Sequence, residues 1–186
     1  MPNKKFFILL ALILTSLACT ISIGGPEYPD TNIPVSSAVV EEMQAQFKAA
    51  FEAGAKGEPI ILTFTEKQLT SLLSQKFENE ENPFFTEPQV HLRDGKMTIY
   101  GKATQGYFVA TIKVVVLVLV DENGQPDMRI ESADFGPFPA PESLSSGLSA
   151  IITEAYTGAA GPVATGFRIE QVAIGDGFLA ILGKVK

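Results

Sequence analysis

Very few side chains in this protein could carry out chemistry. Its 186 residues include one Cys and one His, which excludes an intramolecular disulfide, a cysteine-based zinc site and a multi-histidine metal site. His91 stands between Val90 and Leu92 in a predicted strand, so its imidazole points to the face opposite theirs. No Ser or Cys nucleophile pattern accompanies it. We therefore interpret His91 as a solvent-facing strand residue and not as a general base.

The acidic residues with suggestive spacing lie in predicted turns. Asp94 and Asp176 each precede a glycine, and this pair favours a tight turn that already explains both carboxylates. The segment 121–124 lacks the spaced ligands of an EF-hand, and the glycines at 158–161 lack the lysine of a phosphate-binding loop. The net charge is −7 and no Lys/Arg cluster is present. We expect no enzymatic activity, no metal, no cofactor and no nucleic-acid partner.

The single cysteine, Cys19, follows a segment that is typical of an export signal. Lys4 and Lys5 precede an uncharged apolar run at 6–14, which is too short to span a bilayer because about 20 apolar residues are needed. The residues before Cys19 resemble a bacterial lipoprotein signal, in which the cysteine is the lipid-modified first mature residue. The alternative is an ordinary signal peptide with an incidental cysteine, but a free thiol would be a liability in an exported protein.

This signal divides the chain into three parts. Residues 1–18 are predicted to be a lipoprotein signal peptide, and residues 19–35, rich in Gly and Pro, a lipidated tether. Residues 36–186 then form a single α+β domain. Three acyl chains on Cys19 would hold the protein almost irreversibly, at about 0.8 kcal/mol per buried CH₂. We expect an exported protein that is anchored to the outer face of a bacterial membrane, in the cell envelope.

The elements of the domain follow from apolar periodicity and turn residues. Val40, Met43, Phe47, Ala50 and Phe51 give the first helix one apolar face. Thr65 and Gln68 form a capping box that starts the second helix, with Leu69, Leu72, Leu73 and Phe77 expected on its buried side. The predicted helices are 36–54, 66–77 and 142–156, and the predicted strands are 59–64, 89–93, 96–103, 107–120, 128–135, 166–174 and 178–185.

The chain also repeats itself. Residues 89–102 align without gaps on residues 171–184, with Gln, Val, Asp, Gly, Ile, Gly and Lys in common. Any two Asp-Gly hairpins look alike to some degree, but the matching residues on both sides of the turn favour a duplicated helix-plus-hairpin element.

The most informative feature is an excess of apolar residues in one strand. Residues 114–120 are apolar on both faces, and such a strand must be covered on both sides. One face can pack on a helix, while the other needs a second layer, a partner or a ligand. A two-layer core with nothing bound is the alternative.

A resemblance bears on this choice. The sequence FTEKQLTSLL at 64–73 resembles a helix start seen in YpmS-like and LmeA-like bacterial envelope proteins, and the order of elements after it, with GPFPAP at 136–141, is similar too. These families are similar to the tubular lipid-binding (TULIP) superfamily. The resemblance implies an α+β fold with a highly curved antiparallel sheet wrapped on a helix. It also implies lipid binding at the cell envelope without catalytic residues.

We therefore predict a groove that binds lipid or another apolar ligand between sheet and helix. Its walls would be Val114, Val116 and Val118, or the alternate residues 115, 117 and 119, facing Leu148, Ile152 and Tyr156. Tyr107 and Tyr156 would anchor a headgroup. The alternative is a non-enzymatic interaction module in which an envelope protein partner or a second copy covers the apolar strand.

Overall fold

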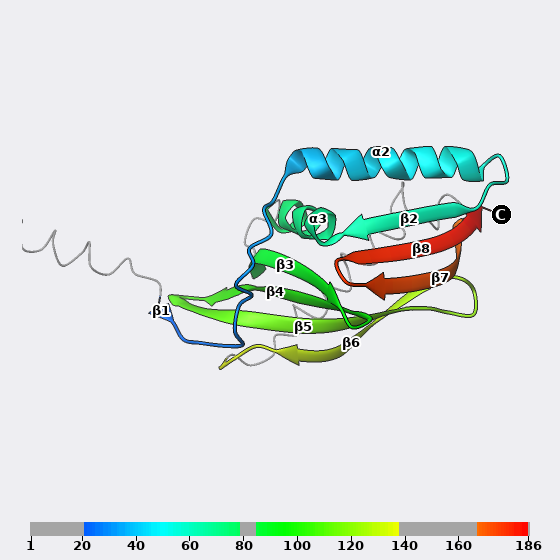
Figure 1. Ribbon diagram of the computed structural model, residues 1–186. Helices are drawn as coiled ribbons and strands as arrows, with labels where there is room; N and C mark the ends of the chain where they lie inside the picture. The colour runs from blue at the N-terminus through cyan, green and yellow to red at the C-terminus, as the bar shows by residue number, and fades with distance from the viewer. Residues whose placement is uncertain (1–20, 79–84, 138–166, 186) are drawn as a thin grey trace, which may run out of the picture.

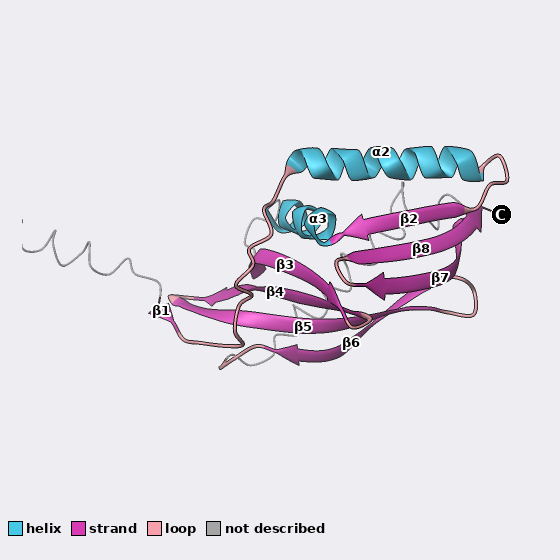
Figure 2. Cartoon of the chain, viewed as in Figure 1, coloured by secondary structure: helices cyan, strands magenta, loops and turns pink. Residues whose placement is uncertain are grey.

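The computed structural model describes residues 21–78, 85–137 and 167–185 and shows a mixed α+β fold (Figure 1). The predicted helix at 142–156 lies outside the described residues, as does Cys19. The elements are β1 (Ile21–Ser22), α2 (Ser37–Gly54), β2 (Ile60–Thr65), α3 (Glu66–Glu78), β3 (Phe85–Arg93), β4 (Lys96–Gln105), β5 (Phe108–Val120), β6 (Pro126–Asp134), β7 (Phe167–Gly175) and β8 (Phe178–Val185). Figure 2 shows the two described helices, α2 and α3, on one side of the strands.

The larger sheet is built around the long strand β5. The sheet runs β3-β4-β5 in antiparallel order, and β6 pairs with the second half of β5 while β1 pairs parallel with its start. Alternate residues of β5 from Ala110 to Val116 are fully buried, and those between them are half-buried. The face that carries Val114 and Val116 therefore packs into the core. The sequence alone did not decide between this face and the opposite one.

The smaller sheet has the order β2-β8-β7, and it meets the larger one through the turns. The Gly177 N–H donates to the Leu92 carbonyl oxygen at 2.9 Å, and the Ile169 N–H donates to the Gly124 carbonyl oxygen at 2.9 Å. Together the sheets form a strongly curled surface, with α2 along the smaller sheet and α3 beside β3 (Figure 1). The prediction of an α+β fold with a strongly curved sheet is confirmed at this level.

The apolar face of α2 is the one that the sequence predicts. Val40 and Met43 are buried, and Phe47, Ala50 and Phe51 pack against the same core. Phe51 meets the ring of Phe167 edge-on, with 5.4 Å between the ring centroids. These contacts attach α2 to the smaller sheet.

The second helix starts as predicted, and it buries polar residues in addition to its apolar side. The Thr65 N–H donates to Gln68 Oε1 at 2.8 Å and the Gln68 N–H donates to Thr65 Oγ1 at 3.2 Å, which confirms the capping box. The buried residues of α3 are Gln68, Thr70, Ser71, Ser74 and Phe77, whereas Leu69, Leu72 and Leu73 are only half-buried. The predicted residues do face the core, since Phe77 is buried and the three leucines pack against it, but the most buried positions of α3 other than Phe77 are polar.

The reason is that β3 is an edge strand and needs hydrogen-bond acceptors. The Val90 N–H donates to Thr70 Oγ1 at 2.9 Å. The N–H of Leu92, two residues further along the strand, donates to Glu66 Oε1 at 2.7 Å. Alternate N–H groups of an edge strand point away from the sheet and would otherwise stay unpaired or attract another chain. The polar side of α3 closes this edge, and Glu66 also pairs with Arg93 at the end of the strand.

Both predicted Asp-Gly hairpins are present, each with a two-residue turn. Asp94 and Gly95 have φ of 54° and 72°, the left-handed geometry of a tight hairpin turn, whereas in the second hairpin only Gly177 has positive φ, at 86°. A β-bulge precedes each turn, between Thr86 and Gln89 in β3 and between Ile169 and Gln171 in β7. The two hairpins thus share the position of the bulge but differ in the turn.

Candidate functional site: a cleft beneath the N-terminal strap

Residues 23–36, here called the strap, lie along the larger sheet. After β1, the Ile23 N–H donates to the Val109 carbonyl oxygen at 2.9 Å, and the Thr111 N–H donates to the Gly24 carbonyl oxygen at 3.0 Å. Gly25 passes so close to the backbone of Thr111 that a Cβ there would lie 2.2 Å from its carbonyl oxygen. The segment that the sequence predicts as a tether is thus bound to the domain over this stretch.

A single buried side chain holds the middle of the strap. Gln89 of β3 is 4% exposed, its Oε1 accepts from the Ile33 N–H at 2.7 Å, and its Nε2 donates to the Ile33 carbonyl oxygen at 3.3 Å. Ile33 is itself buried. Further on, the Ser36 N–H donates to Ser71 Oγ at 3.1 Å, which carries the chain into α2. The side-chain amide of Gln89 therefore makes the two hydrogen bonds to the Ile33 backbone that a neighbouring strand would otherwise make.

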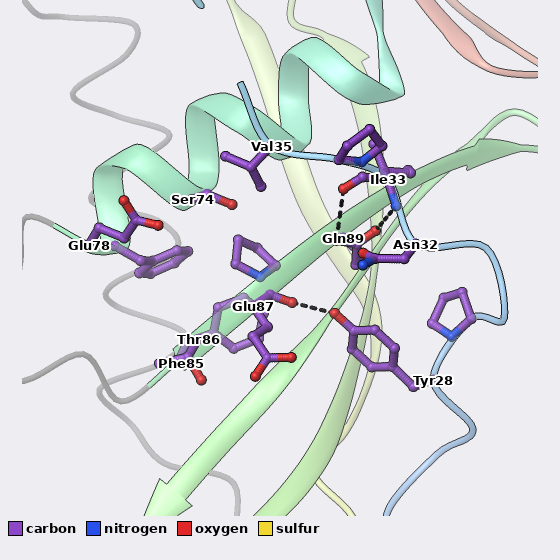
Figure 3. Close-up of a pocket in the computed structure, with 14 residues that line it drawn as sticks. Tyr28, Asn32, Ile33, Val35, Ser74, Glu78, Phe85, Thr86, Glu87 and Gln89 are labelled. Atoms are coloured by element: carbon purple, nitrogen blue, oxygen red, sulfur yellow. Dashed lines mark hydrogen bonds between the residues drawn. The ribbon is translucent and has the colours of Figure 1, made fainter. Parts of the chain in front are cut away.

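The strap and the sheet enclose a cleft of about 580 Å³, here called the strap cleft (Figure 3). Its walls come from residues 28, 29 and 32–35 of the strap, from Ser74, Phe77 and Glu78 in the last turn of α3, and from residues 85–89 at the start of β3. Figure 3 shows Val35 above the cleft and Phe85 below it. Most of the wall is apolar, from Ile33, Val35, Phe77, Phe85 and three prolines.

One rim of the cleft is fixed by Tyr28 and the bulge of β3. Glu87 has a φ of 50°, a left-handed conformation that non-glycine residues rarely adopt. The bulge interrupts the pairing with β4, and the Tyr28 hydroxyl donates to the Glu87 carbonyl oxygen (Figure 3). Burial, and secondly the charge of Glu87, raise the pKa of Tyr28 to about 12, so this phenol stays protonated and able to donate.

The charge at the cleft is negative. Glu78 and Glu87 are the ionised groups among the described residues that line it, and no Lys, Arg or His is among them. The Glu87 carboxylate forms an ion pair with Lys102 at 2.6 Å, both side chains being well exposed. The site therefore offers an apolar wall with carboxylates at its edge and no cation to receive an anion.

Of the residues that the sequence predicts for an apolar groove, the structure describes the four that lie in or beside β5. Val114 is 0% exposed and Val116 is 2% exposed, and both are part of the main core, against which the half-buried Val118 packs. Tyr107 is 70% exposed in the loop between β4 and β5. Leu148, Ile152 and Tyr156 lie outside the described residues. The groove between β5 and residues 142–156 stays a prediction.

His91 is less open to solvent than the sequence predicts. Its imidazole is half-buried against Tyr100, edge-on with 5.6 Å between the ring centroids. Its Nε2 has no hydrogen-bond partner within the described part of the chain. Burial lowers the pKa of His91, although the nearby Glu66 carboxylate acts in the opposite direction. The neutral imidazole is thus favoured.

In residues 21–78, 85–137 and 167–185, no group of three or more His, Cys, Asp or Glu side chains is placed to hold a metal ion. None of the described helices is both long enough and apolar enough to cross a bilayer. No protein-family model matches the chain, and no curated protein matches it significantly. The strap cleft is therefore the candidate site on geometry alone.

Proposed function

We propose that this protein is a membrane-anchored extracytoplasmic lipoprotein, held through Cys19 at the outer face of a bacterial membrane, that binds a lipid or another apolar ligand and is not an enzyme. The observation that carries the ligand-binding part is the strap cleft of about 580 Å³ with its largely apolar wall. Small-molecule sites have volumes of about 300–1,000 Å³ and similar linings. The strap cleft thus replaces the predicted groove as the preferred site.

The lining also defines the class of ligand. The exposed Pro34 and Val35 and the half-buried Pro29, backed by the buried Ile33, Phe77 and Phe85, would remove an acyl chain or a similar group from water, at about 25 cal/mol per Å² of apolar surface buried. Glu78 at the edge would repel a phosphate or carboxylate headgroup, the charge of Glu87 is already paired with Lys102, and the described lining residues include no cation that would bind such a headgroup. The proposed ligand is therefore apolar and carries no net negative charge.

The resemblance to the TULIP superfamily belongs to this proposal. What supports it is the strongly curled sheet and the position of the bulges, which immediately precede the aligned residues Gln89 and Gln171. We propose on the same grounds that the two hairpins descend from one duplicated element, although their turns differ.

Mass spectrometry of the protein taken from its own membrane tests ligand binding. Wild type is compared with Val35→Trp, which places an indole in the mouth of the cleft at a position that is 51% exposed. The matched control is Ile61→Trp, at a position that is 67% exposed on β2 and outside this cleft. We expect a bound lipid in wild type and in the control, and much less of it in Val35→Trp. Equal amounts in all three proteins would contradict the site.

The same preparation distinguishes the alternative function. An interaction module would yield a dimer or a complex with another envelope protein, and no lipid beyond that of a control lipoprotein. Exposed apolar side chains favour this alternative on both faces of the β5–β6 pair: Leu119, 41% exposed, lies on one face, and Ile130, 42% exposed and paired with Val116, lies on the other.

Anchoring is tested separately by labelling cells with a fatty-acid analogue. The label should appear on wild type and disappear in Cys19→Ala. Equal labelling of both proteins would reject the lipoprotein proposal, whatever the strap cleft binds.

A further inference from the structure

The chain enters the domain at one end of the larger sheet, beside the loop that joins β4 to β5. Ile21 pairs with Phe108, and the Ile21 N–H donates to the Tyr107 carbonyl oxygen at 2.8 Å. Figure 1 shows β1 and this loop at the same end of the molecule, opposite the end where β2 begins. We call Ile21, Tyr107 and Phe108 the tip.

The side chains of the tip are apolar or aromatic and are open to solvent. Ile21 is 52% exposed, Tyr107 is 70% exposed and Phe108 is 46% exposed. The chain carries no charged residue from 103 to 112 or from 20 to 26. Three large exposed groups within a stretch that lacks charge form a surface that suits an apolar partner.

The position of the proposed lipid anchor identifies this partner. Cys19 precedes Ile21 by two residues, so covalent geometry alone keeps their Cα atoms within about 7.6 Å, at 3.8 Å per residue. A free tether as long as the strap would instead span roughly 20 Å on average. Because β1 and the strap are bound to the sheet, no free tether separates Cys19 from the domain. The acyl chains would therefore emerge beside the tip.

We propose that the tip rests in the interfacial layer of the bilayer and orients the domain on the membrane, an inference that rests on the proposed lipidation of Cys19. Tyr and other aromatic side chains favour this layer, because their rings are apolar and their edges tolerate water. Groups that lie at this boundary are buried about 5–10 Å into it. The anchor and the tip would then form two points of attachment, so the protein stands on the end where β1 lies.

The test uses the lack of tryptophan in the natural chain. The full lipidated protein is made with Tyr107→Trp and placed in phosphatidylcholine vesicles whose acyl chains carry bromine, which quenches only nearby indoles. The matched control is Ile61→Trp, on β2 and 67% exposed. Both replaced side chains are exposed, so we expect both variants to fold. We expect strong quenching and a blue-shifted emission at position 107, and neither effect at position 61.

Flotation of the vesicles distinguishes the two levels of the proposal. If wild type floats with the vesicles and Cys19→Ala does not, the anchor is present. Equal quenching at positions 107 and 61 in floating protein would then overturn the orientation alone. If wild type does not float, the anchor and the orientation that depends on it both fail.

Discussion

Replacing Gln89 by Met should release the strap while leaving the rest of the fold in place. Met has a similar volume and no amide, so both hydrogen bonds to Ile33 are lost. If the strap stays bound, two buried backbone groups remain without partners, at about 1–3 kcal/mol each. If it lifts, the burial of the Ile33 side chain is lost instead, at about 1.5–3 kcal/mol.

The protein will adopt whichever of these two responses costs less free energy, and that cost is the expected loss of stability. We expect the free energy of unfolding to fall by about 2 kcal/mol, which corresponds to roughly 4–8 °C in Tm for a domain of this size. Hydrogen exchange should locate the change, because 2 kcal/mol of lost protection accelerates exchange of the Ile33 amide roughly 30-fold. Peptides that cover 28–36 should show this acceleration, and peptides from β8 should not.

The chain supplies its own control at the aligned position of the other hairpin. Gln171 follows the bulge of β7 as Gln89 follows that of β3, but its side chain is exposed. Gln171→Met should change the free energy of unfolding by less than about 0.5 kcal/mol, as most surface substitutions do. Unchanged exchange at Ile33 in Gln89→Met, or equal effects of the two substitutions, would refute the role of Gln89 as the clamp of the strap.

Three further predictions concern the sheet and its core. Because the pKa of His91 is lowered in the folded protein, the unfolded chain binds the proton first, so stability should fall as the pH drops below about 6.5; titrated melting curves of His91→Gln should show a weaker fall. Gly101→Ala should cost about 1–3 kcal/mol in denaturant unfolding, because its Cβ would lie 2.1 Å from the Phe85 ring, and Phe85→Leu should cost less in that background than alone. Val116→Trp should lower Tm strongly because Val116 is 2% exposed, whereas Leu119→Trp, at 41% exposure, should melt close to wild type.

The local signals in the sequence predicted the elements well. The capping box at Thr65 and the Asp94–Gly95 turn depend on residues a few positions apart, and both have the expected geometry. The long strand was also predictable from its uninterrupted, mostly β-branched apolar run, although one face is buried and the other only half-buried, with Leu119 exposed.

The burial of the polar residues of α3 and the course of the strap could not be predicted in this way. Apolar periodicity ranks the leucines of α3 above Thr70, but the outward N–H groups of an edge strand create a demand for hydroxyl acceptors that only the sheet order reveals. The strap has no periodicity, and its clamp joins Ile33 to a residue 56 positions away. The internal repeat would even mislead, since it pairs the buried Gln89 with the exposed Gln171.

The pairing of β2 with β8 has a consequence for how the chain reaches this fold. Ile60 pairs with Gly183, so the centre of the smaller sheet joins residues that are more than 100 positions apart. The sheet therefore cannot close until the chain has been made as far as β8. Contacts of such high sequence separation slow folding to milliseconds or seconds, because the closure entropy of a long loop comes before the gain from pairing. A chain that lacks the last eight residues would leave β2 and β7 without the strand between them. Their unpaired edges would then be open to proteases and to pairing with strands of other molecules.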